Sequence, residues 1–139
     1  TLFFSATMPA EIGRLAAELL REPVRVEVTP VASTVDRVSQ RVLHVEAGGK
    51  RGLLAGLLRG PTVERVLVFA RTKHGADKVV KMLEQDGLSA NAIHGNKSQG
   101  QRENALAQFK SGRAPILVAT DIAARGIDVA GVSHVVQYD

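Results

Sequence analysis

Cysteine is absent from the 139 residues of this chain, and aromatic side chains make up only 4% of them. The lack of cysteine excludes disulfide bonds and thiolate metal sites, and it favours a reducing, cytoplasmic location. No stretch approaches the ~20 apolar residues of a membrane span, and no signal peptide is visible. The remaining composition, with 45% hydrophobic residues, is typical of α/β proteins with a core of one domain's size.

Several chemical signatures are missing as well. There is no Gly-x-x-x-x-Gly-Lys-Ser/Thr phosphate loop and no Asp-Glu-Ala-Asp box to hold magnesium. No Gly-x-Gly-x-x-Gly follows the first expected strand, which argues against a Rossmann or flavodoxin-like enzyme. Ser5 lies outside any Gly-x-Ser-x-Gly elbow, which argues against a serine nucleophile. The four histidines show no metal-ligand spacing, so we expect neither a metal site nor a catalytic histidine.

The charge balance of the chain is basic. Lysine and arginine outnumber the acidic residues by 18 to 14, which gives a net charge of +4 and a pI near 9.9. This surplus permits a polyanionic partner without requiring one, so the partner has to be identified from the motifs.

Hydrophobic periodicity predicts an alternation of helices and strands. A helical stripe follows Pro9, and a stretch with proline and hydroxyl residues at 29–39 is the expected interdomain linker. Beyond it the alternation predicts an α/β fold, with a parallel sheet and helices on both faces. The expected strands are 24–28, 41–46, 65–70, 88–93, 115–119 and 133–137, and the expected helices are 9–20, 49–58, 73–85 and 98–110.

The most informative segment is 119–128, which follows an apolar run typical of a buried parallel strand. Thr120 and Asp121 would stand at the carboxyl end of that strand, where open α/β sheets bind their ligands. Arg125 and Asp128 follow around a glycine, which allows close approach of a partner to the backbone. Such a group suits contacts to phosphate and ribose. A helix N-cap with an Arg–Asp surface pair is the alternative interpretation.

The helix expected at 98–110 begins with a capping box, in which Ser98 is the N-cap and Gln101 the third helical residue. Gln99 and Arg102, three positions apart, share one face of the first turn. The free N–H groups and positive end of the helix favour an anion there, and the arginine adds a charge suited to phosphate. A solvated surface arginine is the alternative.

Two further positions have more than one interpretation. Thr72 follows an expected strand and can either cap the next helix or present its hydroxyl to a phosphodiester. Its neighbours Arg71 and Lys73 are cations of a kind common on surfaces. Gly95 would let the chain approach a sugar-phosphate closely, but a plain turn glycine accounts for it equally well.

Four blocks, in this order and at these spacings, resemble the DEAD-box RNA helicases of helicase superfamily 2. Ser5-Ala6-Thr7 is similar to their motif III and residues 66–73 to motif IV. Gln99 with Arg102 matches the QxxR element, and residues 120–128 match motif V. The run 94–99 is similar to the bacterial RhlE-like subgroup. The resemblance covers nearly the whole chain and implies a RecA-like fold.

The resemblance also implies roles for individual residues. RNA contacts are expected at Thr72, Gly95, Gln99, Arg102 and Thr120. ATP contacts are expected at Gly126 and Asp128, where the carboxylate would accept hydrogen bonds from a ribose hydroxyl. Coupling between two domains is expected at Ser5, Ala6, Thr7 and Arg125.

By the same resemblance the chain is expected to be a fragment. Residues 1–28 would be the tail of a first RecA-like domain, 29–39 the linker and 40–139 an incomplete second RecA-like domain without motif VI. ATP and Mg²⁺ would be cofactors of the full-length parent, and the fragment would need neither. The expected partners are RNA, the missing first domain and, through its exposed apolar side chains, a second copy of the fragment; no membrane is expected.

The implied parent is an ATP-dependent RNA helicase whose two domains close on ATP and single-stranded RNA and so unwind short duplexes. The fragment alone is expected to be inactive. The alternative is an RNA-binding or adaptor protein with a degenerate, ATP-independent helicase domain. The intact Thr120-Asp121 and Arg125-Gly126-x-Asp128 pattern argues against that alternative.

Overall fold

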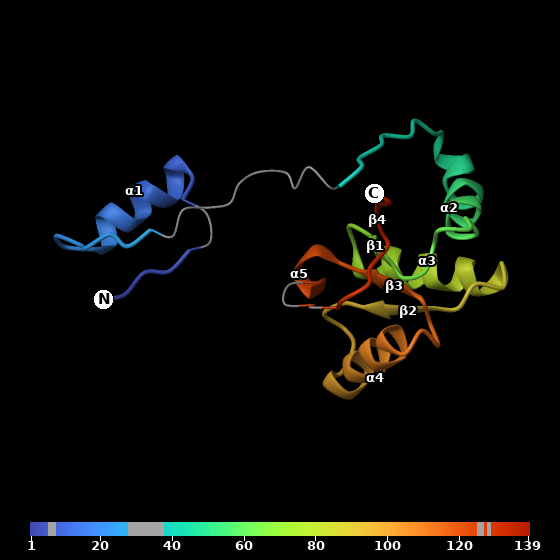
Figure 1. Ribbon diagram of the computed structural model, residues 1–139. Helices are drawn as coiled ribbons and strands as arrows, with labels where there is room; N and C mark the ends of the chain where they lie inside the picture. The colour runs from blue at the N-terminus through green and yellow to red at the C-terminus, as the bar shows by residue number, and fades with distance from the viewer. Residues whose placement is uncertain (6–7, 28–37, 125–126, 128) are drawn as a thin grey trace. The chain divides into compact units, whose positions relative to one another are not determined.

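The structure is a computed structural model that describes residues 1–5, 8–27, 38–124, 127 and 129–139. The chain divides into two compact units, residues 1–41 and residues 42–139. The first unit is drawn in blue in Figure 1 and the second runs from green to red. The assignment of residues 1–28 to the tail of another domain stays a prediction.

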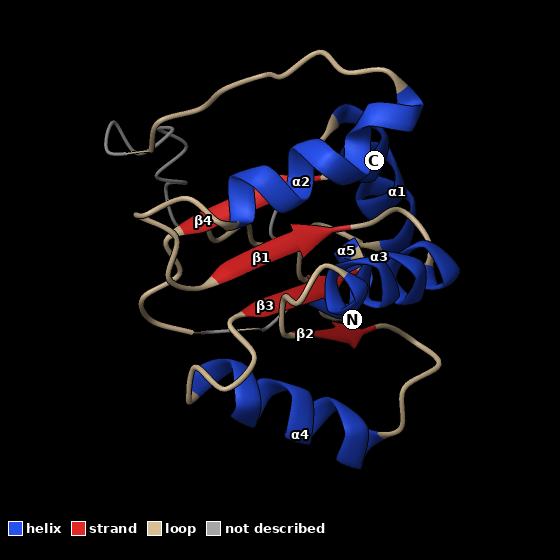
Figure 2. Ribbon diagram, turned by 90° about the vertical axis from the view of Figure 1, so that its right-hand side faces the viewer, coloured by secondary structure: helices blue, strands red, loops and turns tan. Residues whose placement is uncertain are grey.

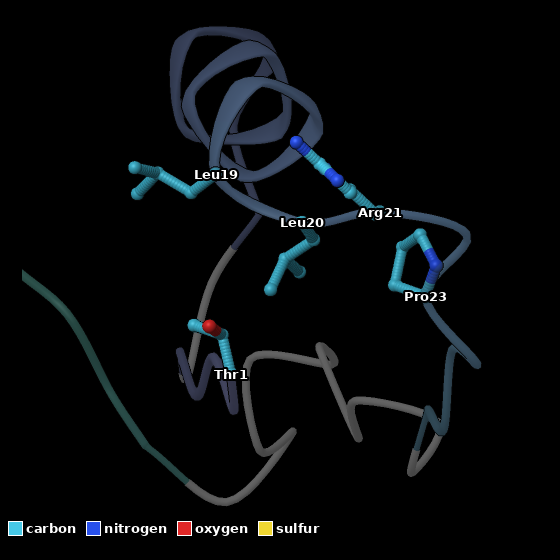
Figure 3. A pocket seen from close by; sticks show the side chains of 5 residues that line it. All are labelled: Thr1, Leu19, Leu20, Arg21 and Pro23. Atoms are coloured by element: carbon cyan, nitrogen blue, oxygen red, sulfur yellow. The ribbon is translucent and has the colours of Figure 1, made fainter.

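The first unit contains one helix, α1 (Ala10–Leu19), among its described residues. The helix expected after Pro9 is therefore confirmed, with Pro9 at the N-cap. No residue of α1 is buried, although Leu15 and Leu19 form part of its apolar stripe. Thr1 and the residues around the end of α1 line an open hollow of about 330 Å³ (Figure 3). No predicted site residue with a described position is among those that line it. Exposed apolar groups of this kind motivate the predicted self-association, which stays a prediction.

Two of the expected strands are wrong. Residues 24–27 and 41–46 have no regular secondary structure, and Val28 lies outside the described residues. The four described strands pair only with one another, so neither segment has a neighbouring strand. A strand is stabilised by pairing and by side chains packed across it, and alternation alone supplies neither. The apolar side chains are accordingly exposed, Val42 by 82%.

The second unit is built on a four-stranded parallel sheet. Its strands are β1 (Val66–Phe69), β2 (Ala90–Ile93), β3 (Ile116–Ala119) and β4 (His134–Gln137). Figure 2 shows them in the order β2-β3-β1-β4, with every neighbouring pair parallel. The four expected strands from residue 65 onward are thus confirmed. Because the strands are parallel and in register, their carboxyl ends share one edge of the sheet.

Helices cover both faces of this sheet, as expected. On one face α2 (Lys50–Leu58), preceded by a 3-10 turn at Ala47–Gly49, and α3 (Lys73–Gln85) pack against β1 and β3. On the other face α4 (Gln99–Lys110) and the short α5 (Asp121–Ala124) pack against β3 and the end of β2. The side chains of β3 alternate between the two cores, with Val118 in the first and Leu117 in the second. The burial of β3 on both faces explains its continuous apolar sequence.

The local stop and start signals of α3 and α4 are also confirmed. Thr72 caps α3, and Gly87, with a φ of 75°, ends it in the left-handed region. The N-cap of α4 is Ser98, whose capping box with Gln101 is complete. Both helices begin at the carboxyl edge of the sheet, so these caps fix where the candidate site can lie.

Gly131 offers a test of the packing at the opposite, amino edge of the sheet. Its φ is 76°, and a Cβ built on it would lie 2.6 Å from the Arg65 guanidinium, which donates to the Lys110 carbonyl at 3.3 Å. Gly87 has a similar φ but open space around it. Both Gly131→Ala and Gly87→Ala should lower the free energy of unfolding by about 1–2 kcal/mol, because alanine is strained in the left-handed region. Gly131→Ala should lower it by about 0.5–1.5 kcal/mol more, because the Arg65 guanidinium must give up its hydrogen bond to the Lys110 carbonyl.

Urea unfolding of the two variants measures this difference. Equal losses would show that the guanidinium of Arg65 is not held against Gly131.

Candidate nucleic-acid interface

Three loops of the second unit meet at the carboxyl edge of the sheet. They follow β1, β2 and β3 and lead into α3, α4 and α5. Backbone hydrogen bonds tie them together: Ala70 N–H donates to the Ala119 carbonyl at 3.0 Å, and Thr120 N–H donates to the Ile93 carbonyl at 3.3 Å. The residues predicted to contact RNA, namely Thr72, Gly95, Gln99, Arg102 and Thr120, all lie in these loops or in the first turns of the helices that follow.

The structure shows one of the two interpretations of Thr72 and leaves room for the other. Its Oγ1 accepts a hydrogen bond from Gly75 N–H at 3.0 Å, so the helix cap is confirmed. The side chain is exposed, and a hydroxyl that accepts one hydrogen bond still has its own proton to donate. Capping therefore leaves Thr72 able to donate to a phosphate oxygen.

The turn after β2 presents Gly95 to solvent. Lys97 N–H donates to the His94 carbonyl at 3.0 Å, which closes a turn with Gly95 and Asn96 at its centre. The φ of Gly95 is not positive, and an added Cβ would meet nothing within 4 Å. The fold itself therefore does not require glycine here, which favours close approach of an outside partner over a plain turn.

The first turn of α4 carries Gln99 and Arg102. Gln99 is exposed, and its Nε2 donates to Glu103 Oε1 at 2.8 Å. Arg102 is half-buried, and no carboxylate of the described residues forms an ion pair with it. An arginine without an internal partner at a helix N-terminus is suited to an external anion. Glu103 opposes this effect with one negative charge on the same turn.

Thr120 lies between β3 and α5 and is half-buried. Its carbonyl accepts hydrogen bonds from Ala123 N–H at 2.9 Å and Ala124 N–H at 3.0 Å, which begins α5. Asp121, next to it, is exposed, as is Ile122. The Thr120 hydroxyl makes no hydrogen bond to the described residues, so it is available to a ligand.

The structure does not test the remaining predicted residues. Ala6, Thr7, Arg125, Gly126 and Asp128 lie outside the described residues. Ser5 is exposed and belongs to the first compact unit. The ATP contacts and the coupling between domains therefore stay predictions.

A buried histidine was missed by the sequence analysis. The His94 side chain is only 2% exposed and comes directly after β2. Its Nδ1 accepts a hydrogen bond from Asn96 N–H at 3.3 Å, and its Nε2 lies 3.0 Å from Asp77 Oδ1. The period of two along β2 could have revealed it, because Ala90, Ala92 and His94 share the side that faces α3.

The electrostatics around His94 extend to two lysines. Lys97 Nζ lies 3.0 Å from the same oxygen of Asp77, and Lys73 Nζ donates to Asn96 Oδ1 at 3.1 Å. His94 and then Lys97 hold the pKa of the Asp77 carboxyl below its ordinary value, although partial burial acts in the other direction. The Asp77 side chain thus remains ionised at neutral pH and links α3 to the turn after β2.

This edge of the sheet offers hydroxyls, free backbone N–H groups and a guanidinium, which are groups that bind phosphates. No cluster of three potential metal ligands occurs among the described residues. No helix in the described part of the chain is long and apolar enough to cross a membrane. The arrangement is therefore suited to holding a polyanion.

The chain is similar to proteins of a known family. Residues 49–139 match the family model described as the helicase conserved C-terminal domain. A structure of the E. coli DEAD-box protein SrmB, bound to regulator of ribonuclease activity A, is 38% identical over 66% of this chain and 54% of that chain, with a TM-score of 0.62.

A structure of S. cerevisiae Dbp5 bound to RNA and ADP BeF3 is 28% identical. That match covers 98% of this chain and 35% of the Dbp5 chain, with a TM-score of 0.82. The C-terminal domain of the DEAD-box protein Dbp5 is 32% identical over 66% of this chain and 51% of that one, with a TM-score of 0.59. The chain thus spans about half of the SrmB chain and about a third of the longer Dbp5 chain.

Proposed function

Because the chain belongs to the helicase conserved C-terminal domain family, and within it to the DEAD-box type, we propose that its second unit is the RNA-binding second RecA-like domain of an ATP-dependent RNA helicase. The observation that carries this proposal is the convergence of Thr72, Gly95, Arg102 and Thr120 on one edge of the sheet. Each offers a donor or an open approach to a ligand.

RNA is bound through its backbone in this proposal. The hydroxyls of Thr72 and Thr120 and the guanidinium of Arg102 donate to phosphate oxygens, and Gly95 lets the strand approach the turn closely. Gln99 contributes its amide once it leaves Glu103. Contacts to phosphates and 2′-hydroxyls carry little sequence information, so the domain should accept most single-stranded RNA sequences.

In this proposal ATP binds only when a first RecA-like domain is also present. Gly126 and Asp128 face ATP across the cleft to a first RecA-like domain, and Asp128 accepts hydrogen bonds from a ribose hydroxyl. Ser5, Ala6, Thr7 and Arg125 couple the two domains. The phosphate loop and the Mg²⁺ ligands are supplied by the first domain. ATP and RNA each favour the closed arrangement and therefore strengthen each other's binding. The structure of Dbp5 with RNA and ADP BeF3 supports this proposal.

The 139-residue chain should bind single-stranded RNA weakly and hydrolyse no ATP, with or without RNA. Its affinity should fall with salt, because log K decreases by about 0.7 per phosphate contact for each unit of log salt. Fluorescence anisotropy with a labelled oligouridylate measures the binding, and phosphate release measures the ATPase activity. RNA-stimulated ATPase activity of the chain alone would contradict the proposal that a first domain supplies the phosphate loop and the Mg²⁺ ligands.

ATPase activity distinguishes the helicase from the alternative of an ATP-independent adaptor. A protein that contains this chain together with a first RecA-like domain should show RNA-stimulated ATPase activity. RNA binding by that protein without any ATPase activity would favour an ATP-independent adaptor.

A further inference from the structure

His94 holds two successive N–H groups of the turn after β2. Its carbonyl accepts from Lys97 N–H at 3.0 Å, and its Nδ1 accepts from Asn96 N–H at 3.3 Å. The N–H of Gly95, which comes just before them in the chain, makes no hydrogen bond to the described residues, and Gly95 is exposed. The N–H groups of Asn96 and Lys97 are therefore used within the turn, and the N–H of Gly95 is left for an outside acceptor.

The protonation of the ring follows from these contacts. A ring nitrogen that accepts a hydrogen bond carries no proton, so Nδ1 is bare and the neutral ring has its proton on Nε2. Nε2 faces Asp77 Oδ1 at 3.0 Å. Nε2 has no aligned hydrogen-bond partner among the described residues, so its contact to Asp77 is weaker than a well-formed hydrogen bond.

The same cluster connects the turn to α3 at three points. Asp77 of α3 attracts both His94 and Lys97, and Lys73 at the start of α3 donates to Asn96. The imidazole is almost fully buried, whereas the Asp77 side chain is 47% exposed. The buried ring is thus the least mobile group of the cluster, and the more exposed side chains of Asp77 and Lys97 pack next to it.

We propose that His94 is a positioning residue for RNA binding. Its ring and its carbonyl fix the turn so that the Gly95 N–H and the first turn of α4 point toward the same phosphate track. Without the Nδ1 acceptor, the Asn96 N–H would have to find another partner and the turn would move. This inference rests on the proposed function, because RNA is the ligand that the turn serves.

Two substitutions separate the two ring nitrogens. In His94→Asn the amide oxygen occupies the place of Nδ1, so the acceptor for Asn96 N–H is kept and the reach to Asp77 is lost. In His94→Gln the amide nitrogen extends to the place of Nε2, so the contact to Asp77 is kept and the Nδ1 acceptor is lost. His94→Gln should weaken binding of a labelled oligouridylate about fivefold, the effect of one lost hydrogen bond, and His94→Asn less than twofold.

Asp77→Asn tests the other end of the cluster at a half-exposed position that the fold tolerates. It removes one negative charge, so electrostatics alone would strengthen RNA binding. Positioning instead predicts about a twofold to threefold weakening, since the remaining amide oxygen holds Lys97 and the ring less strongly than the carboxylate does. Glu84→Gln, at the far end of α3, removes the same charge away from the turn and should leave RNA binding unchanged or slightly stronger.

The backbone amides provide a readout without RNA. In ¹H–¹⁵N spectra the Asn96 amide should shift strongly in His94→Gln and little in His94→Asn, while the melting temperatures report any general loss of stability. If the wild-type chain binds no RNA, the proposed function fails, and these spectra still test the positioning of the turn. Equal RNA affinities for both His94 variants, an unmoved Asn96 amide in His94→Gln, or stronger RNA binding by Asp77→Asn than by Glu84→Gln would each overturn the inference.

Discussion

Replacing Arg102 by alanine is expected to weaken binding of single-stranded RNA about tenfold, or about 1.4 kcal/mol. The guanidinium lies in the first turn of α4, is half-buried and pairs with no described carboxylate. Its removal takes away a charged hydrogen bond to phosphate, which is worth about 1.5–3 kcal/mol when fully formed. The salt dependence of binding should also lose about 0.7 of its slope, the share of one phosphate contact.

Arg113 provides a matched control for Arg102. It is exposed in the loop between α4 and β3, at the end of α4 away from the candidate site. Arg113→Ala removes the same charge, so any general electrostatic effect is equal in the two variants. Similar losses of RNA affinity would mean that attraction is diffuse and that Arg102 has no specific role.

Replacing Phe109 by alanine is expected to lower the free energy of unfolding of the second unit by about 3–5 kcal/mol. The ring is 0% exposed and belongs to the core between α4, α5 and the sheet, where it packs with Ile93 and Leu117. No neighbouring element can close a cavity of that size fully, because the sheet side is already packed. Since α4 carries Gln99 and Arg102, RNA affinity should fall with the folded fraction.

Urea unfolding with Phe109→Leu as a companion tests this expectation. Leucine keeps much of the apolar volume, so that variant should lose only about 1–2 kcal/mol. A loss below 1 kcal/mol for Phe109→Ala would show that α4 is not docked on the sheet through this ring.

The elements with local signals could be predicted closely from the sequence. The helix at 73–85 has the bounds that Thr72 as its cap and Asp86-Gly87 as its end indicate. The parallel sheet with helices on both faces and the RecA-like class are confirmed as well. These features depend on residues within one or two turns of each other, or on a continuous apolar run, and both can be recognised without the rest of the chain.

The missed features depend on contacts between distant residues. The alternation at 24–28 and 41–46 describes a strand's two faces, but pairing needs a second strand that no local pattern reveals. His94 gains its importance from Asp77, on another helix. The φ of Gly95 and the space around it bear on its two interpretations, and both come from the folded structure. The RhlE-like assignment and the residues for ATP and domain coupling stay predictions.

The strand order sets the spatial order of the three loops at the carboxyl edge of the sheet. Along the chain the loops come in the order 72, 95, 120, but β3 lies between β2 and β1, so in space they come in the order 95, 120, 72. Neighbouring strands are about 4.8 Å apart, so the outer two loops are separated by two such steps. An RNA strand that crosses this edge therefore meets the turn after β2 at one end and the cap of α3 at the other, with Thr120 in the middle. The order in which a bound strand would meet the three loops is therefore set by the strand order of the sheet and not by the order of the loops along the chain.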